Sequence, residues 1–355
     1  MVKTVKVPNA ADLRDLRVID THVHMSFRHT IGQSEEYYRT IIQERRYDSM
    51  VFVATTESSK GRDPLSNVQA LWFKRAFAGC RALASLVYRH DERDTAEEFL
   101  RQAKEARELG FEGMKMLEGK PNVYRNIGIP LDSPAYEKFF AYLEENGIPV
   151  TMHLGDPAEF WDADKVSEYA KKAGWFYGDP SYPTREKLYN EVWNILTRHP
   201  ALKLNLAHFG FFGDRPELAE EYMGRWKNTC LDLTPGGCMF TFFSAKPDYW
   251  KDYFRRYSDR ILFGTDTYNL PENYEAAGST TGRWGLVRTF LEYKEPYIYG
   301  SPEGTLIPFG FEDEMLNKIY RENAVKLFGN VRAIDEERAG LDKLLTKDSF
   351  VGMRE

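Results

Sequence analysis

The stretch that decides the fold of this chain is VIDTHVHM, residues 18–25. It is a short apolar run that carries two histidines, His22 and His24, one residue apart. Side chains two positions apart on an extended strand point to the same face, so both imidazoles face the same way at the end of this strand. Such a pair can bind one metal ion, and further ligands would have to come from other strands that end nearby.

Short apolar runs alternate with segments of helical period along the rest of the chain. The helices expected at 97–109 and 135–145 each carry one apolar stripe, and Gly110 and Gly147 end them. Apolar strands that are each followed by a helix predict parallel strands covered on their outer side, and eight such units can close into a barrel. The expected strands are 18–25, 48–55, 80–88, 111–117, 148–154, 202–208, 228–233 and 261–266.

These elements predict a distorted (β/α)8 TIM barrel with long loops at its C-terminal mouth. The alternative is an open doubly wound sheet, which is disfavoured because no GxGxxG turn follows the first strand. Three long connections, 26–34, 155–183 and 267–311, follow strands and therefore belong at the mouth. No low-complexity linker divides the chain, so we expect one domain over residues 1–355 with a core of about 18–328.

The composition and charge of the chain limit the kinds of molecule that the protein is expected to bind. A net charge of -6, spread without a basic block, argues against binding to nucleic acid or to an anionic membrane surface. No apolar run reaches the roughly 20 residues that a membrane span needs. Three widely spaced cysteines suit buried thiols in a reducing compartment. We therefore expect a cytoplasmic protein with a small-molecule substrate, which forms a homo-oligomer, most simply a dimer.

Three further polar side chains stand at expected strand ends. His153 ends the fifth strand, His208 the sixth, and Asp266 the eighth. Alone, each is more simply explained as a hydrogen-bonded structural residue, but together with His22 and His24 they favour a metal centre at one rim. A zinc or manganese ion with an open position lowers the pKa of bound water to about 7. Asp266 would accept a proton there, and His208 would polarise a substrate oxygen or take part in proton transfer.

In this order and spacing, the motifs resemble the amidohydrolase superfamily. The similarity is strongest to the branch that contains the aminocarboxymuconate-semialdehyde and γ-resorcylate decarboxylases. The resemblance spans about residues 18 to 328 and rests on IDTHVH (19–24), PVTMH (149–153), AH (207–208), ILFGTD (261–266) and IYRENAVKLF (319–328). It implies one divalent ion, zinc or manganese, held by His22, His24, His153 and Asp266, with His208 beside it.

Lys115, near the end of the fourth strand, leaves three interpretations open. In other branches of the superfamily a carbamylated lysine on this strand bridges two metals, and His153 and His208 then hold the second ion. Otherwise Lys115 pairs with a nearby carboxylate such as Glu118, or it offers its ammonium to an acidic substrate. The ion-pair and ammonium interpretations are favoured over carbamylation. Because a buried ammonium needs a partner, we expect a functional or ion-pair role for Lys115 either way.

Two arginines are candidates for binding a substrate carboxylate. Arg89 follows the third strand, and Arg185 lies in the first turn of a helix that begins near Thr184, after the long loop 155–183. Either guanidinium could make a two-pronged contact with a carboxylate. A solvated surface position is the simpler explanation for each.

The resemblance leaves three functions open, because the branch contains both hydrolases and carbon–carbon lyases. We favour a hydrolase that attacks an ester, lactone or amide carbonyl with metal-activated water. The second hypothesis is nonoxidative decarboxylation of an unsaturated or aromatic acid, which needs a cationic group beside the metal, supplied by Arg89, Arg185 or Lys115. The third is a barrel that binds metal and ligand without turnover.

Overall fold

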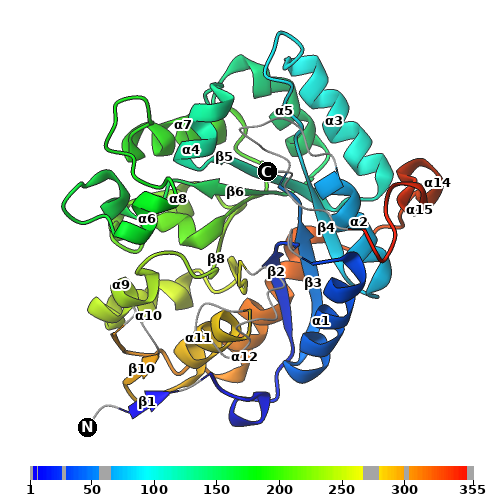
Figure 1. Cartoon of the computed structure of the whole chain (residues 1–355). Helices are drawn as coiled ribbons and strands as arrows, with labels where there is room; N and C mark the ends of the chain where they lie inside the picture. Colours follow the sequence, from blue (N-terminus) through cyan, green and yellow to red (C-terminus); the bar gives the residue numbers. More distant parts are fainter. Residues whose placement is uncertain are drawn as a thin grey trace.

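Eight parallel strands form a nearly closed barrel with helices between them, so the predicted TIM barrel is confirmed (Figure 1). The computed structural model describes residues 3–5, 7–25, 29–55, 65–266, 280–299 and 304–349. The strands pair in chain order, each with the next. They are β2 Val18–Val23, β3 Tyr47–Val53, β4 Arg81–Ser85, β5 Gly113–Gly119, β6 Val150–Leu154, β7 Leu204–Leu206, β8 Thr229–Asp232 and β9 Ile261–Leu262.

The helices around the barrel form where the sequence provides caps and an apolar stripe. In α3 (Ala96–Leu109) the Thr95 side chain accepts the backbone N–H of Glu98, the stripe from Phe99 to Ala106 is buried, and Gly110 ends the helix at φ 105°. The others are α1 Ile31–Glu44, α2 Leu65–Ala76, α4 Pro121–Ile127, α5 Glu137–Glu145, α6 Glu168–Lys172, α7 Arg185–Arg198, α8 Pro216–Arg225, α9 Met239–Ala245, α10 Pro247–Arg256, α11 Thr280–Glu292, α12 Asp313–Asn317, α13 Asn323–Phe328, α14 Glu336–Ala339 and α15 Leu341–Leu344.

Individual hydrogen bonds join the first and last barrel strands at the seam. Thr21 N donates to Phe263 O at 3.0 Å, and Asp266 N donates to His22 O at 2.9 Å. A π-helical turn, Lys318–Glu322, lies between α12 and α13, and its Ile319 carbonyl accepts Phe263 N at 2.9 Å. The C-terminal helical segment therefore braces the seam at Phe263, and the backbone N–H of Asp266 holds that residue beside β2.

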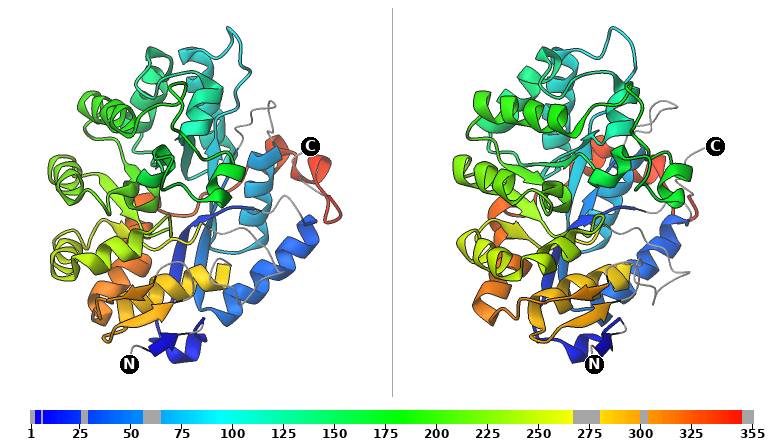
Figure 2. Two further views of the ribbon diagram at one scale, coloured as in Figure 1. Left: turned by 60° about the vertical axis from the view of Figure 1, so that its left-hand side comes forward. Right: turned by 90° about the vertical axis from the view of Figure 1, so that its left-hand side faces the viewer.

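The expected long loop 267–311 is wrong in part, because it contains regular structure. Residues 280–292 form α11, and Tyr297–Tyr299 (β10) pairs with Lys3–Val5 (β1) and Thr305–Leu306 (β11) in a small sheet outside the barrel (Figure 2). Residues 267–279 and 300–303 lie outside the described part of the chain. Because β10 pairs with a strand almost 300 residues away, its own local sequence does not reveal it.

The loop 155–183 and the state of the cysteines agree with the predictions from the sequence. The loop 155–183 carries only the 3-10 turn Ala158–Trp161 and the short helix α6. The three cysteines are free thiols, two of them buried.

Among the described residues, no helix combines the length and apolar character needed to cross a membrane. The assignment of residues 1–355 to one domain stays a prediction.

Candidate metal centre

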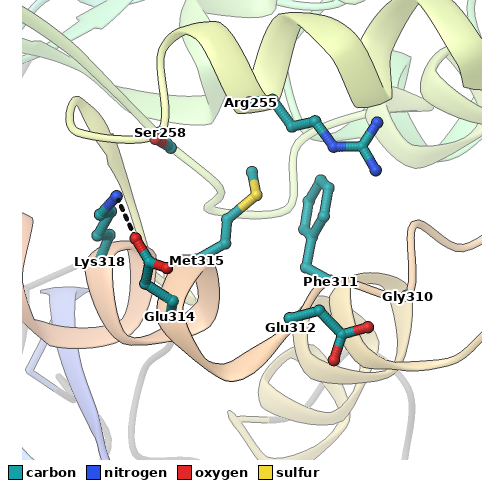
Figure 3. Close-up of a pocket in the computed structure, with 8 residues that line it drawn as sticks. All are labelled: Arg255, Ser258, Gly310, Phe311, Glu312, Glu314, Met315 and Lys318. Carbon is teal, nitrogen blue, oxygen red and sulfur yellow. Dashed lines mark hydrogen bonds and ion pairs between the residues drawn. The ribbon is translucent and has the colours of Figure 1, made fainter.

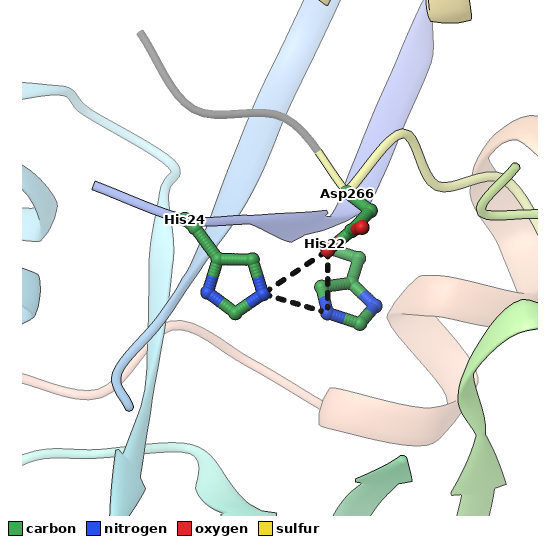
Figure 4. Close-up of side chains that lie close together, drawn as sticks. All are labelled: His22, His24 and Asp266. Atoms are coloured by element: carbon green, nitrogen blue, oxygen red, sulfur yellow. Dashed lines mark hydrogen bonds and ion pairs between the residues drawn. The ribbon is translucent and has the colours of Figure 1, made fainter. Parts of the chain in front are cut away.

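His22, in β2, and His24, directly after β2, turn the same ring atoms toward each other. His22 Nε2 lies 3.1 Å from His24 Nε2, and both residues are buried (Figure 4). His22 Nδ1 faces Asp232 Oδ2 at 3.3 Å, and His24 Nδ1 faces the Val53 carbonyl at 3.1 Å. These acceptors place the ring proton on Nδ1 in each case. Both Nε2 atoms are then proton-free and available as ligands.

Asp266 completes a group of three at the same place. Its Oδ1 lies 3.2 Å from His24 Nε2 and 3.7 Å from His22 Nε2. One ligand atom from each of the three residues lies within 4.8 Å of the others. Two imidazole nitrogens without protons and a carboxylate oxygen repel one another unless a cation lies near them. The donor set suits a borderline divalent ion such as zinc, so these residues fit the metal that the motifs imply.

Burial keeps three histidines of this rim, His22, His153 and His208, in the neutral form. Burial, reinforced by the charge of Lys115, lowers the pKa of His22 to about 3. Burial likewise lowers the pKa of His153 and of His208 to about 4. Neutral imidazole is the form that binds a metal, so these histidines need not lose a proton near pH 7 to act as ligands.

His153 lies at the same rim but outside the group of three. Its ring is 4.8 Å from that of His208, between centroids, and its Nε2 faces Asp156 Oδ1 at 3.2 Å. The Asp156 carboxylate also accepts Lys120 Nζ at 2.7 Å and Tyr177 Oη at 2.6 Å. In this arrangement Nε2 of His153 is directed at a carboxylate, and the role of His153 as a metal ligand stays a prediction.

His208 sits on a strained stretch of backbone directly after β7. His208, Phe209, Gly210 and Phe211 all have positive φ values, between 50° and 59°. Such a conformation is costly for non-glycine residues and is found where a side chain must be aimed. The His208 ring lies 5.8 Å from the His22 ring, and its Nδ1 faces the Thr234 carbonyl at 3.3 Å. The carbonyl places the proton on Nδ1, which leaves Nε2 as a proton acceptor.

Lys115 directly contacts the histidine pair. It is fully buried, and its Nζ lies 3.1 Å from His22 Nε2. Burial lowers the pKa of its ammonium to about 8. The Glu118 carboxylate accepts Tyr88 Oη at 2.5 Å, and the described structure forms no ion pair between Lys115 and Glu118, one of the three interpretations of Lys115. The only cationic candidate that the described structure brings to the histidine pair by direct contact is therefore Lys115.

The two candidate arginines differ in their surroundings. Arg185, at the start of α7, is buried, and its guanidinium binds both oxygens of Asp214, at 2.8 and 3.0 Å, and the Phe211 carbonyl at 3.1 Å. These contacts tie α7 to the strained turn after β7. Arg89 is partly exposed, and its backbone N–H donates to Asp94. A substrate contact for either arginine stays a prediction.

Two polar residues beside the group were not expected from the sequence. Asp232, at the end of β8, accepts His22 Nδ1 through Oδ2 and the His208 backbone N–H through Oδ1, at 3.0 Å. Its position near the carboxyl end of the seventh expected strand, 228–233, is the signal that the sequence offers. Arg283 of α11 binds Asp266 Oδ2 at 3.2 Å. No sequence pattern indicates Arg283, because residues 267–311 are expected to form a loop.

A separate cavity lies near the amino end of β9. Its lining includes Arg255 and Ser258, which precede β9, and Met315 and Lys318 near the π-helical turn (Figure 3). These residues are close to the amino end of β9, whereas Asp266 follows the carboxyl end. Active sites of such barrels lie at the carboxyl ends of the strands, so this cavity is not the candidate site.

A parallel eight-stranded barrel with a His–His–Asp group at the carboxyl ends of its strands has the arrangement of a metal-dependent barrel enzyme. A family model described as amidohydrolase matches residues 19–330, and the chain belongs to this family. The resemblance predicted from the motifs is therefore confirmed. No curated protein matches the sequence.

Solved structures share the fold at low sequence identity. An uncharacterized TIM-barrel protein from Bordetella bronchiseptica aligns with 92% of this chain and 100% of its own, at 15% identity and a TM-score of 0.57. An IDCase from Metarhizium anisopliae in apo form aligns over 88% and 97%, at 13% identity and a TM-score of 0.50. A 4-oxalomesaconate hydratase from Rhodopseudomonas palustris aligns over 92% and 99%, at 15% identity and a TM-score of 0.48. At these identities the likeness shows the fold alone.

Proposed function

We propose that this protein is a metal-dependent hydrolase that attacks an ester, lactone or amide carbonyl of a small organic substrate. The observation that carries the proposal is the convergence of His22 Nε2, His24 Nε2 and Asp266 Oδ1 at the carboxyl ends of β2 and β9. His153 is the proposed fourth ligand. A divalent ion held by these atoms, zinc with manganese as the alternative, would polarise a carbonyl oxygen and acidify a bound water.

The neighbouring residues supply proton transfer and charge in this proposal. Asp266 takes a proton from the attacking water and passes it to the leaving group. His208 assists through Nε2, the atom left as an acceptor by the contact of Nδ1 with the Thr234 carbonyl. The Lys115 ammonium, 3.1 Å from His22 Nε2, supplies positive charge where negative charge develops on the substrate oxygen.

The second candidate function is nonoxidative decarboxylation of an unsaturated or aromatic acid. It requires a cation beside the metal that can bind a carboxylate, and the buried Lys115 ammonium satisfies that requirement. Hydrolysis remains the first proposal because the proton acceptors Asp266 and His208 stand together at the centre, as attack by water demands.

An isotope experiment distinguishes the two reactions. The metal-loaded protein would be screened against esters, lactones, amides and unsaturated acids in labelled water. Hydrolysis is expected to place 18O from water in the product without release of CO2. Release of CO2 with solvent deuterium entering a carbon position would contradict the hydrolase proposal and support the lyase. Turnover of none of these classes by a protein that binds metal stoichiometrically would favour the non-catalytic barrel.

We also propose that the protein acts in the cytoplasm as a homodimer. The support for the location is compositional: a net charge of -6 without a basic block and free cysteines. Sedimentation equilibrium of the purified chain tests the dimer, and a single species of monomer mass would contradict it.

A further inference from the structure

The orientation of the Asp266 carboxylate is not fixed by its own backbone. Asp266 follows β9 with a φ of 52°, and its N–H donates to the His22 carbonyl at 2.9 Å. This bond places the residue beside His22. The terminal torsion of an aspartate is broad, however, so the plane of the carboxylate could rotate its oxygens away from the histidines at little cost. A contact from beyond the barrel strands is needed to hold that plane.

Arg283 is the group in position to do so. It lies on α11, outside the barrel, and reaches the end of β9 with a single nitrogen. Arg283 Nη1 lies 3.2 Å from Asp266 Oδ2, 3.0 Å from the Asp266 carbonyl, 3.3 Å from the Thr265 carbonyl and 3.5 Å from the Pro235 carbonyl. Two hydrogens shared among four acceptors make a clamp of bifurcated bonds across the ends of β8 and β9.

The clamp divides the two oxygens of Asp266 between two tasks. Oδ2 is engaged by the guanidinium, and Oδ1 is left at 3.2 Å from His24 Nε2. A charge-assisted contact on Oδ2 resists rotation of the carboxylate. The same nitrogen also binds the carbonyl of Asp266 itself, so it holds the strained left-handed backbone as well as the side chain.

We propose that Arg283 is a positioning residue of the metal centre: it holds Asp266 with Oδ1 toward His22 and His24 and thereby sets the affinity for a divalent cation. This inference rests on the proposed metal-dependent function. The positive charge of Arg283 by itself would repel a cation and weaken its binding. Positioning of Asp266 raises the affinity for a divalent cation, and repulsion by the guanidinium charge lowers it. The direction in which the affinity changes when Arg283 is removed therefore decides between the two effects.

The test measures metal binding without turnover. Wild type, Arg283→Met, Arg283→Lys and the surface control Arg93→Met, which removes another arginine–carboxylate contact, would be stripped of metal. The Zn2+ affinity of each is then measured by competition with a chromogenic chelator. We expect Arg283→Met to bind Zn2+ about 10- to 100-fold more weakly. Arg283→Lys should fall between, since its ammonium keeps the positive charge but stands on a shorter and more flexible side chain, and Arg93→Met should match wild type.

Two further readouts separate positioning from general damage. The visible absorption of the Co2+-loaded protein should change in Arg283→Met, because it reports the ligands around the metal, and thermal melting should show a folded chain. If Arg283→Met does not fold, the same comparison is made on Arg283→Lys. Added ethylguanidinium should partly restore the affinity of Arg283→Ala.

The outcomes distinguish a failure of the positioning role of Arg283 from a failure of the proposed metal-dependent function. Unchanged or tighter Zn2+ binding by a folded Arg283 variant would overturn the positioning role, while leaving the metal centre intact. Absence of stoichiometric Zn2+ in wild type would instead overturn the proposed function, and the role of Arg283 with it.

Discussion

His22 and His24 hold their Nε2 atoms 3.1 Å apart, and each ring is fixed from behind through Nδ1, one by Asp232 and the other by the Val53 carbonyl. Two nitrogens without protons at that separation are unfavourable on their own and favourable around a cation. The backing contacts orient the ligands before the ion arrives, as outer partners of metal-bound histidines do.

Replacing His24 by alanine should abolish stoichiometric metal binding while the barrel remains folded, because barrel stability comes from packing. His153→Ala should also lose metal if His153 supplies the fourth ligand. Metal content is measured by plasma emission after dialysis, with circular dichroism as the control for folding. Full metal content in His153→Ala, beside loss in His24→Ala, would assign His153 to Asp156 instead of the metal.

Asp266→Asn tests the proton acceptor. The amide keeps the shape of the carboxylate but cannot accept the proton, so kcat should fall by about 100- to 10,000-fold. Some metal should remain bound through the histidines. Steady-state kinetics on the substrate identified by the isotope screen, with metal content measured on the same sample, provides the check. A variant with full metal and near-normal kcat would remove Asp266 from proton transfer.

Asp232→Asn tests the residue that the sequence did not reveal. The Asp232 carboxylate accepts both His22 Nδ1 and the backbone N–H of His208. Its replacement should weaken metal affinity by about 10- to 100-fold, since the proton and orientation of His22 are no longer held. Zn2+ competition assays give the affinity. An equal affinity in variant and wild type would show that burial alone orients His22.

Lys115→Met distinguishes an ammonium from a carbamate. An ammonium 3.1 Å from His22 Nε2 competes with a cation for the same ligand, so its removal should leave one metal per chain and raise or preserve the affinity. A carbamylated Lys115 would be a ligand, and its removal would lower the metal content. Carbon NMR after addition of 13C-bicarbonate provides a second check, because a carbamate gives its own signal.

Glu118 should make stability depend on pH near neutrality. Burial raises its pKa to about 7 from an ordinary 4.5, and within the described structure Oε2 has no hydrogen-bond partner. Between these values the folded protein binds more protons than the unfolded chain, so the free energy of unfolding falls as pH rises from about 4.5 to 7. The whole effect is about 3 kcal/mol.

Glu118→Gln should remove this dependence. Urea unfolding of wild type and variant at pH 4.5 and pH 8 measures it. The variant should gain stability relative to wild type on going to pH 8. A constant difference between the two proteins across that range would place the pKa of Glu118 near its ordinary value.

The sequence by itself determined the barrel and the order of its strands. Parallel strands that are buried on both faces appear as apolar runs, and that local pattern located all eight. It also determined that His22, His24 and Asp266 meet, because the carboxyl ends of parallel barrel strands lie at one rim.

Only the tertiary structure decided what surrounds those three residues. The contact of Arg283 with Asp266 joins a helix to a strand end across residues 267–279, and no local pattern reports such a pair. Likewise, His153 turns its Nε2 to Asp156, three residues further along. Strand periodicity fixes the face of the strand from which a side chain projects. The orientation of an imidazole ring and the nitrogen that carries its proton depend instead on hydrogen-bond partners from other elements, and those partners decide which ring atoms of the candidate metal centre are available as ligands.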